Sequence, residues 1–256
     1  MRKIAVGGKG GSGKSSIAAL LAYGMRERGY RVLVVDSDES NPGLYRMLGL
    51  ERRPAPLLKL VGGKSRVFQT FSEESEPPQN ILAREEIRVA DIPGEYIVGM
   101  DGIGLVCIGK ILQSLEGCAC PMGVLNREFL GRLSLREDEV AIVDMEAGIE
   151  HFGRGVETSI DSMLIVTHPS LDSLELAGKM HVLAAEVGME NVWTILNRIR
   201  SEEIGSKLRD ELERTGVPVI GSIGYEPEIF QSGLEGRPVR IDKLKTDIES
   251  ILDQLL

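Results

Sequence analysis

Lys9-Gly10-Gly11-Ser12-Gly13-Lys14-Ser15-Ser16 stands between an apolar run, Ile4-Ala5-Val6, and a second apolar run that starts at Ile17. From Gly8 to Ser15 the sequence satisfies G-x-x-x-x-G-K-[ST], the pattern of a phosphate-binding loop between a strand and a helix. In such loops the glycines let backbone N–H groups close around phosphates, the lysine reaches the outer phosphates and the hydroxyl binds magnesium. The stretch from Gly8 to Ser16 therefore predicts binding of ATP or ADP with Mg²⁺.

The size and composition of the chain indicate an α/β protein. At 256 residues it can bury a substantial core, and we expect residues 1–256 to form one domain. Aromatic residues make up only 4% of the chain, and short apolar runs alternate with helical patterns. This alternation predicts a doubly wound, mainly parallel sheet with helices on both faces.

Charge and hydropathy exclude several classes of protein. The net charge is −9 and no basic stretch is present, which argues against binding to nucleic acid. No segment approaches the roughly 20 apolar residues that span a bilayer. The N-terminus also lacks the positively charged residues followed by an apolar stretch that mark a signal peptide. We therefore expect a cytoplasmic protein with neither membrane nor nucleic acid as partner.

Apolar runs outline the order of the elements. A second strand is expected over Arg31–Val35 and a short helix over Pro42–Leu48. Further strands are expected over 87–90, 104–108, 140–143, 163–166, 192–196 and 217–220, and a final helix, packed on the body, from about Asp242. Residues 51–80 lose periodicity and read as an irregular insertion, in which Gly62-Gly63-Lys64-Ser65 is interpreted as a turn because no strand precedes it.

Two carboxylate motifs follow apolar strands. Asp144 follows the apolar run Ala141-Ile142-Val143, and Gly148 comes four positions later. This D-x-x-x-G spacing is typical of an aspartate that approaches Mg²⁺ and of the switch II loop, which responds to the terminal phosphate. The second expected strand ends at Asp36-Ser37-Asp38. We assign Ser15, Asp38 and Asp144 to the magnesium environment, and Asp38 to positioning of the attacking water, with Asp36 as the alternative carboxylate.

The phosphate loop resembles the deviant Walker A subgroup of P-loop ATPases, which is marked by a lysine at the head of a Gly-Gly-x-Gly-Lys loop. The resemblance implies a homodimer closed around sandwiched nucleotides, in which Lys9 reaches the partner's phosphates while Lys14 binds those of its own subunit. The alternative for Lys9 is a solvated surface lysine. Asp36-Ser37-Asp38 resembles the family's first switch, although Glu39 replaces the usual proline. Ile195-Leu196-Asn197-Arg198 matches the strand end that reads adenine, and the loop around Pro227 resembles the one that closes over the base.

Cysteine spacing adds a second kind of chemistry. Cys118-Ala119-Cys120 precedes Pro121 and an expected helix whose apolar face includes Leu125, Phe129, Leu130 and Leu133. Two thiolates cannot complete a tetrahedral site, but two copies across a dimer axis would supply four sulfur ligands for Zn²⁺ or Ni²⁺. The alternative is a pair of cysteines without a ligand role, which is how we read Cys107 in its apolar strand.

Gly117-Cys118-Ala119-Cys120-Pro121 and the stretch from Val143 to His151 resemble the CooC-type ATPases, over nearly the whole chain. These enzymes mature carbon monoxide dehydrogenase by supporting nickel insertion. The resemblance implies that Cys118 and Cys120 hold the metal at the dimer interface, and that the client is carbon monoxide dehydrogenase or an acetyl-CoA synthase complex.

Two other functions remain as alternatives. One is an iron-sulfur reductase of the nitrogenase iron protein type, whose two cysteines per subunit lie far apart in sequence, unlike this C-x-C pair. The other is a partitioning or positioning ATPase without metal, against which the acidic composition argues.

Overall fold

The computed structural model describes residues 3–38, 40–72, 78–109, 120–149, 152 and 155–256. Its main sheet has eight strands in the spatial order β10-β9-β8-β1-β7-β2-β5-β4. Neighbouring strands pair in parallel, except that β4 runs antiparallel to β5. The bounds are β1 Lys3–Gly8, β2 Arg31–Asp36, β4 Ile97–Met100, β5 Ile103–Cys107, β7 Glu139–Asp144, β8 Ser162–Thr167, β9 Val192–Ile199 and β10 Val219–Gly224.

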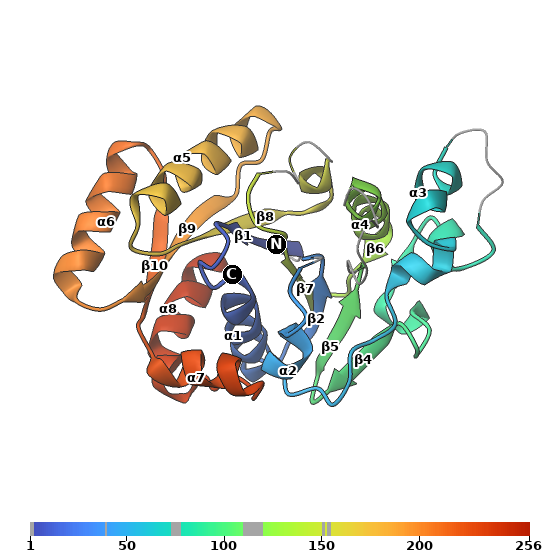
Figure 1. Cartoon of the computed structure of the whole chain (residues 1–256), viewed down its shortest axis with the longest axis horizontal. Coiled ribbons are helices and arrows are strands. Elements are labelled where there is room, and N and C mark those ends of the chain that lie inside the picture. Colours follow the sequence, from blue (N-terminus) through green and yellow to red (C-terminus); the bar gives the residue numbers. More distant parts are fainter. Residues whose placement is uncertain (1–2, 39, 73–77, 110–119, 150–151, 153–154) are drawn as a thin grey trace.

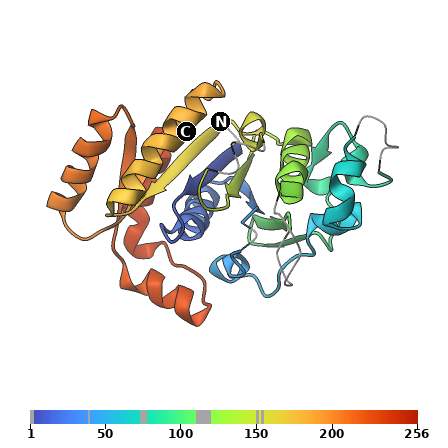
Figure 2. The ribbon, with the colours of Figure 1, turned by 45° about the horizontal axis from the view of Figure 1, so that its top comes forward.

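Helices cover both faces of this sheet. In Figure 1, α4, α5 and α6 lie on one side of the sheet, and α1, α2 and α8 lie on the other. Figure 2 shows the same layers with the top of the molecule turned forward. The predicted doubly wound α/β architecture is therefore confirmed. The helices are α1 Lys14–Glu27, α2 Leu44–Met47, α3 Lys64–Thr70, α4 Cys120–Arg132, α5 Leu171–Glu186, α6 Glu202–Arg214, α7 Pro227–Glu235 and α8 Lys245–Leu255.

Strand residues alternate between two apolar cores, one on each face of the sheet. On β1, Ile4 and Val6 belong to the core under α1 and α8, whereas Ala5 belongs to the core under α4 and α5. Successive side chains of a strand point to opposite faces, so a strand covered on both sides needs apolar residues at every position. This requirement explains why the sequence shows continuous apolar runs rather than alternation.

The direction of winding reverses beside β1. Strands β7, β2, β5 and β4 lie on one side of β1 within the sheet, and β8, β9 and β10 lie on its other side. In open α/β sheets such a reversal leaves a crevice at the carboxyl ends of the strands, where ligands bind. The carboxyl ends of β1, β2 and β7 therefore define the edge at which a site is expected.

The sequence-based expectation for residues 87–90 was partly wrong. Only Ile87–Arg88 form a strand, β3, which pairs with β6 (Leu133–Ser134) in a separate two-stranded sheet. The chain then turns into a 3-10 helix over Val89–Asp91, because the Asp91 carboxylate accepts a hydrogen bond from the Arg88 backbone N–H at 2.9 Å. This local bond closes the turn and ends the strand.

The antiparallel strand β4 was not anticipated. It joins β5 through Asp101 and Gly102, with φ values of 50° and 83° respectively. Two consecutive residues with positive φ are the hallmark of a type I′ hairpin turn, which favours Asp-Gly. The Asp-Gly dipeptide between Ile97–Met100 and Ile103–Cys107 is therefore the sequence feature from which this hairpin could have been predicted.

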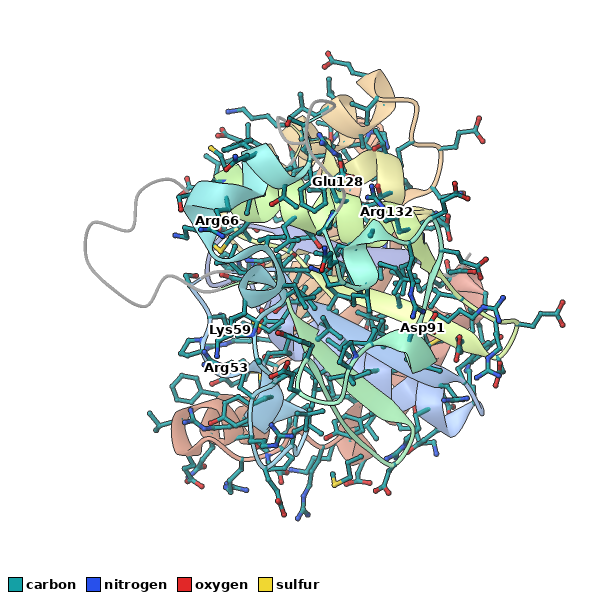
Figure 3. All side chains as sticks on the ribbon, turned by 90° about the vertical axis from the view of Figure 1, so that its right-hand side faces the viewer. Arg53, Lys59, Arg66, Asp91, Glu128 and Arg132 are labelled. Carbon is teal, nitrogen blue, oxygen red and sulfur yellow. The ribbon has the colours of Figure 1, made fainter. Side chains whose placement is uncertain are left out.

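Residues 51–80 are more regular than expected. They include a 3-10 helix over Leu57–Val61 and helix α3, which places Val67 in the core at 0% exposure. Gly62 and Gly63 form a turn before α3, and no strand leads into it, in keeping with the interpretation of Gly62-Gly63-Lys64-Ser65 as a turn. Figure 3 views this end of the molecule, where Glu128 and Arg132 of α4 lie next to each other as an ion pair.

The C-terminal helix packs as predicted. A 3-10 turn over Asp242–Leu244 leads into α8, whose residues Ile248, Ile251, Leu252 and Leu255 are all fully buried. Among the residues described, no helix has the length and apolarity that crossing a bilayer requires.

Candidate functional site

The loop between β1 and α1 has the backbone that phosphate binding requires. Gly8 adopts φ 136°, and a Cβ there would lie 2.5 Å from the carbonyl oxygen of Val166. Gly13 adopts φ 99°, and a Cβ there would lie 2.3 Å from Nδ2 of Asn197. Only glycine fits at both places, because any side chain would collide with a neighbouring strand. The loop thus opens directly onto the first turn of α1, whose N–H groups attract anions.

The two lysines of the loop differ in their surroundings. Lys14 is 6% exposed, and its Nζ lies 3.5 Å from the carbonyl oxygen of Lys9, so its ammonium is held at the loop. Lys9 instead extends to α5, where its Nζ donates to Oδ2 of Asp172 at 2.6 Å. Lys14 is thus placed for phosphates in its own loop, whereas Lys9 points away from them.

Oxygen donors converge beside Lys14. Ser15 Oγ donates to Oδ2 of Asp144 at 2.6 Å, and Asn41 Nδ2 donates to Ser15 Oγ at 2.6 Å. Asp144 is fully buried, and among the described residues its Oδ1 has no hydrogen-bond partner. A hydroxyl and a carboxylate with an unused oxygen fit Mg²⁺, a hard cation that takes oxygen ligands and keeps several waters. Sequence reasoning found Ser15 and Asp144 but missed Asn41, for which spacing gave no indication.

Asp144 lies in an acidic, desolvated setting. Burial, followed by the negative charge of Asp36, raises the pKa of its carboxyl from 3.8 to about 7, against the opposing effects of the Ser15 bond and the Lys14 charge. Buried carboxylates resist ionisation because the charged form loses its hydration. A divalent cation would reverse this effect by neutralising the carboxylate.

The loop after β2 folds around Asp38. This residue is 7% exposed, and its Oδ1 accepts bonds from the backbone N–H of Ser40 at 2.8 Å and from Ser40 Oγ at 2.6 Å. Ser37 Oγ donates to the Asp144 carbonyl at 2.9 Å, which ties this loop to the end of β7. The structure therefore brings Asp38 to the edge that also carries Asp144 and Lys14. Glu39, the departure from the family pattern, lies outside the described residues.

The loop after β7 contacts the phosphate loop. Gly148 adopts φ 94°, and its N–H donates to the Gly8 carbonyl at 3.2 Å. A Cβ built on Gly10 would lie 3.7 Å from the Cβ of Ala147. The Gly148 loop is therefore in direct contact with the phosphate loop, the arrangement that a nucleotide-sensitive switch requires.

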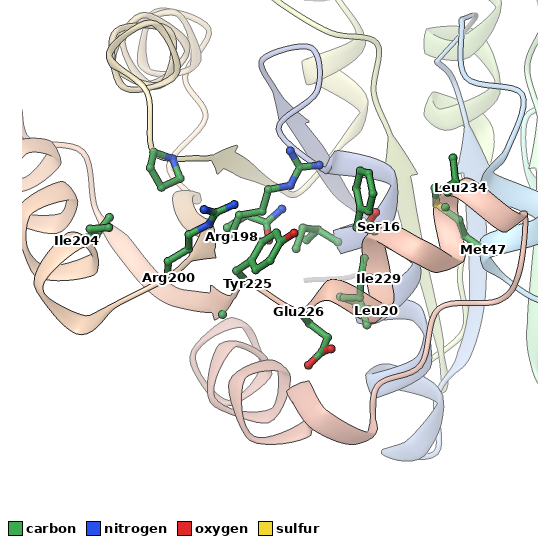
Figure 4. Close-up of a pocket in the computed structure, with 16 residues that line it drawn as sticks. Ser16, Leu20, Met47, Arg198, Arg200, Ile204, Tyr225, Glu226, Ile229 and Leu234 are labelled. Carbon is green, nitrogen blue, oxygen red and sulfur yellow. Dashed lines mark hydrogen bonds between the residues drawn. The ribbon is translucent and has the colours of Figure 1, made fainter.

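A cavity of about 640 Å³ opens beside the first turn of α1 (Figure 4). Asn197 and Arg198, which the sequence assigns to the adenine, line this cavity, whereas Pro227 does not belong to its lining and is the first residue of α7. Asn197 Nδ2 donates to the Ser12 carbonyl at 2.8 Å, so this amide joins β9 to the phosphate loop. The remaining lining residues are Ser16, Ile17, Leu20, Met47, Pro169, Arg200, Ile204, Gly224, Tyr225, Glu226, Ile229, Phe230, Gly233 and Leu234.

Tyr225 and Arg200 are lining residues that the sequence did not single out. The Arg200 guanidinium carbon lies 4.6 Å from the centre of the Tyr225 ring, a cation–π arrangement. A flat aromatic ring with a polar rim suits a nucleobase, and the cavity adjoins the site of the phosphates. The loop around Pro227 thus contributes Tyr225 and Glu226 to the cavity, and the role of Pro227 itself stays a prediction.

The cysteines are placed as follows. Cys107 is 0% exposed in β5, as predicted for a core residue. Cys120 is the first residue of α4, and Cys118 lies outside the described residues. Within the portion of the chain that is described, no group of three His, Cys, Asp or Glu side chains is arranged to hold a metal ion. The C-x-C metal site therefore remains a prediction.

A profile of the CobQ/CobB/MinD/ParA nucleotide binding domain matches residues 3–239. The chain belongs to this family. The phosphate loop, the Asp144 strand end and the parallel sheet described above are thus those of a MinD/ParA family P-loop ATPase, and the prediction of an ATPase is confirmed.

Two relatives of this MinD/ParA family chain cover nearly its full length. An uncharacterized ATP-binding protein of Methanocaldococcus jannaschii is 39% identical over 98% of this chain and 97% of its own length. The carbon monoxide dehydrogenase accessory protein CooC of Rhodospirillum rubrum is 34% identical over 89% of this chain and 85% of its own length.

Solved structures of the family share the fold. The cell division ATPase MinD of Pyrococcus furiosus is 20% identical, with a TM-score of 0.70, over 100% of this chain and 99% of that one. The septum site-determining protein MinD of Pyrococcus horikoshii, solved with Mg-ADP, is 18% identical, with a TM-score of 0.66, over 99% and 95% respectively.

Proposed function

We propose that this ATPase is a nucleotide-gated homodimer that supports nickel insertion into carbon monoxide dehydrogenase or an acetyl-CoA synthase complex. The observation that carries the proposal is the position of Cys120. It is the first residue of α4, the next described element after β5, and β5 pairs in parallel with β2, whose carboxyl end leads to Asp38. The 34% identity to CooC of Rhodospirillum rubrum supports the same reading.

Each part of the phosphate site has a role in this proposal. Lys14 binds the outer phosphates, while Ser15 and Asp144 hold Mg²⁺, which the substrate MgATP brings and which neutralises the developing phosphate charge. Asp38 orients the attacking water, for which its place at the same strand edge is suited. Lys9 acts in trans on the phosphates of the partner subunit, as an arginine finger does.

The chain leads from the Gly148 loop to an element that packs against α4. The loop that contains Gly148 continues, beyond residues 150–154, to the 3-10 helix Val156–Ser159, which packs against α4. Ser159 Oγ also donates to the Arg127 carbonyl within α4 at 3.3 Å. Movement of the Gly148 loop on hydrolysis would therefore shift α4 and the Cys120 at its start.

The metal site needs both subunits. Cys118 and Cys120 supply two thiolates per chain, and a two-fold axis supplies the other two of a tetrahedral set for Ni²⁺ or Zn²⁺, which are cargo in this scheme. Binding of ATP would bring the two pairs together, and hydrolysis would separate them. Metal release is thereby coupled to the nucleotide.

The test is metal stoichiometry by elemental analysis, after Ni²⁺ loading under reducing conditions with ATP, with ADP and without nucleotide. We expect about one metal per dimer, changed by nucleotide and lost in the Cys118→Ser, Cys120→Ser double variant. Cys107→Ala is the matched control and should retain the metal, because Cys107 is a core residue.

Other results would replace the proposal. A brown protein with broad visible absorption after anaerobic purification would indicate an iron-sulfur reductase of the nitrogenase iron protein type. Equal metal content in the wild type and the double variant would refute the cysteine site. Co-sedimentation with DNA or liposomes, together with no metal, would favour a positioning ATPase.

A further inference from the structure

The segment that ends in α3 is basic, although the chain as a whole is acidic. Residues 52–72 contain five basic residues and no acidic one, and acidic residues return at Glu73, whereas the whole chain has 30 basic and 39 acidic residues. Figure 3 shows Arg53, Lys59 and Arg66 in a row along one border of this end of the molecule. We call these three side chains the basic face.

The basic face keeps its positive charge. Within the described parts of the chain, the exposed side chains of Lys59 and Arg66 form no ion pair and donate no hydrogen bond. Arg53 donates to a backbone carbonyl at 2.7 Å, which leaves its charge in place. On the same end of the molecule, by contrast, Glu128 is neutralised by Arg132 at 2.5 Å.

An open hollow of about 810 Å³ lies between the 3-10 helix Leu57–Val61 and α3. Lys59 and Arg66 line it, together with the side-chain amides of Gln69, Gln79 and Asn80, and none of the described lining residues is acidic. A carboxylate that entered this hollow would meet two cations and several amides. Hydrogen bonds between a cation and a carboxylate are stronger than those between neutral groups.

An exposed aromatic ring accompanies these charges. Arg66 and Phe68 lie on the two flanks of α3, on either side of the buried Val67, and Phe68 is 56% exposed. Aromatic residues and arginine are enriched in protein–protein interfaces, and an interface of ordinary size would cover both flanks of so short a helix. Tight binding of duplex DNA uses roughly 6–10 phosphate contacts, more than three side chains supply. The chemistry therefore favours a protein segment with acidic and apolar residues.

The basic face is connected to the helix that begins at Cys120. The Leu58 N–H donates to the Ile108 carbonyl at 3.0 Å, which fixes the 3-10 helix to the end of β5. Helix α3 packs against α4, and the guanidinium carbon of Arg132 on α4 lies 5.9 Å from the centre of the Phe71 ring. A protein bound at the basic face would therefore lie close to α4.

We propose that the basic face is the docking surface for an acidic segment of the client protein, with Phe68 as the apolar contact beside it. The inference rests on the proposed function for the identity of the client, whereas the charge of the face does not depend on it. Opposite charges across an interface speed the encounter and select its orientation. Docking at this place holds the client beside α4 during transfer of the metal.

The test uses two probes. The first is a fluorescein-labelled peptide of aspartate, glutamate and leucine, whose binding is followed by anisotropy, with the asparagine and glutamine version of the same peptide for comparison. The second is nickel-free carbon monoxide dehydrogenase, whose binding is followed by interferometry. The variants are Phe68→Ala and the double variant Lys59→Glu, Arg66→Glu. The matched control is Lys179→Glu, Lys207→Glu, which changes the net charge equally on α5 and α6, at the opposite end of the molecule.

We expect Lys59→Glu, Arg66→Glu to weaken binding of both probes about tenfold or more, because attractions are replaced by repulsions. Phe68→Ala should weaken it about threefold, and the Lys179→Glu, Lys207→Glu control should bind like the wild type. Added salt should lower the affinity of the wild type, because it screens exposed charges. All variants should hydrolyse ATP and unfold on heating like the wild type, since these side chains are exposed and lie outside the phosphate site.

Three results would contradict the proposal. Equal affinity of the wild type and Lys59→Glu, Arg66→Glu for the acidic peptide would refute the docking surface, and so would equal affinity of the wild type for the acidic and the amide peptide. Displacement of the peptide by duplex DNA at a lower concentration than by unlabelled acidic peptide would assign the face to nucleic acid. If the acidic peptide binds at the face and carbon monoxide dehydrogenase does not, the docking surface stands and the client named in the proposed function fails.

Discussion

Replacing Asp144 by asparagine should stabilise the protein without nucleotide more at pH 8 than at pH 5, on the order of 4 against 2 kcal/mol. Burial and the charge of Asp36 raise the pKa of Asp144 from 3.8 to about 7 in the folded chain. The folded state therefore resists ionisation of this carboxyl more than the unfolded state does. The protonated Asp144 carboxyl therefore favours the folded state. This contribution to the free energy of unfolding is fully present below about pH 4 and is lost as the pH rises through about 7.

The size of the effect follows from the two pKa values. A pKa unit corresponds to about 1.4 kcal/mol, so a change from 3.8 to about 7 is worth on the order of 4 kcal/mol above pH 7. Asparagine keeps an oxygen that accepts the Ser15 hydroxyl but carries no charge. For a chain of this size the gain at pH 8 corresponds to a rise in Tm on the order of 10 °C.

The assay is thermal unfolding followed by circular dichroism from pH 5 to pH 8, without nucleotide or Mg²⁺. Asp138→Asn is the control, because Asp138 is an exposed carboxylate just before the other end of β7. Mg-ADP should raise the Tm of the wild type at pH 8 more than that of Asp144→Asn, since the cation neutralises the ionised carboxylate. A Tm difference between variant and wild type that is the same at pH 5 and pH 8 would refute the reasoning.

Four further predictions concern single residues. Asp38→Asn should lower kcat for ATP hydrolysis at least about 100-fold, with a Kd for ATP near that of the wild type, as measured by single-turnover kinetics and titration. Gly13→Ala should abolish ATP binding in calorimetry, because its Cβ would lie 2.3 Å from Asn197 Nδ2. Asn41→Ala should weaken the dependence of ATP binding on Mg²⁺ without affecting Mg²⁺-free binding, since Asn41 holds Ser15 Oγ. Phe129→Ala should lower the free energy of unfolding by about 3–5 kcal/mol in urea, as Phe129 is fully buried.

Short-range patterns predicted much of the fold and of the phosphate site. The loop from Gly8 to Ser15 and the aspartate at the end of β7 carry their chemistry within a few residues, so spacing was enough. The hairpin of β4 and β5 also had a local signature, Asp101-Gly102, which the apolar run alone did not reveal.

Contacts between distant segments could not be predicted in this way. The bond from Asn41 to Ser15 spans 26 positions, and that from Lys9 to Asp172 spans 163. Tyr225 and Arg200 meet only because β9 and β10 end side by side. These pairs depend on strand order and loop shape, which a pattern of residue types does not contain. The role of Cys118 and Cys120 remains a prediction from the sequence.

The hydrogen bond between Asn197 and the Ser12 carbonyl ties the wall of the cavity beside α1 to the phosphate loop. Asn197 stands at the end of β9 in the wall of the cavity beside α1, and the same amide leaves no room for a side chain at Gly13. A change at Asn197 would therefore alter the shape of the phosphate loop. Substitution of Asn197 to change the preferred nucleobase should therefore lower the affinity of the protein for pyrophosphate as well as for ATP. This general loss should exceed any gain in affinity for another base.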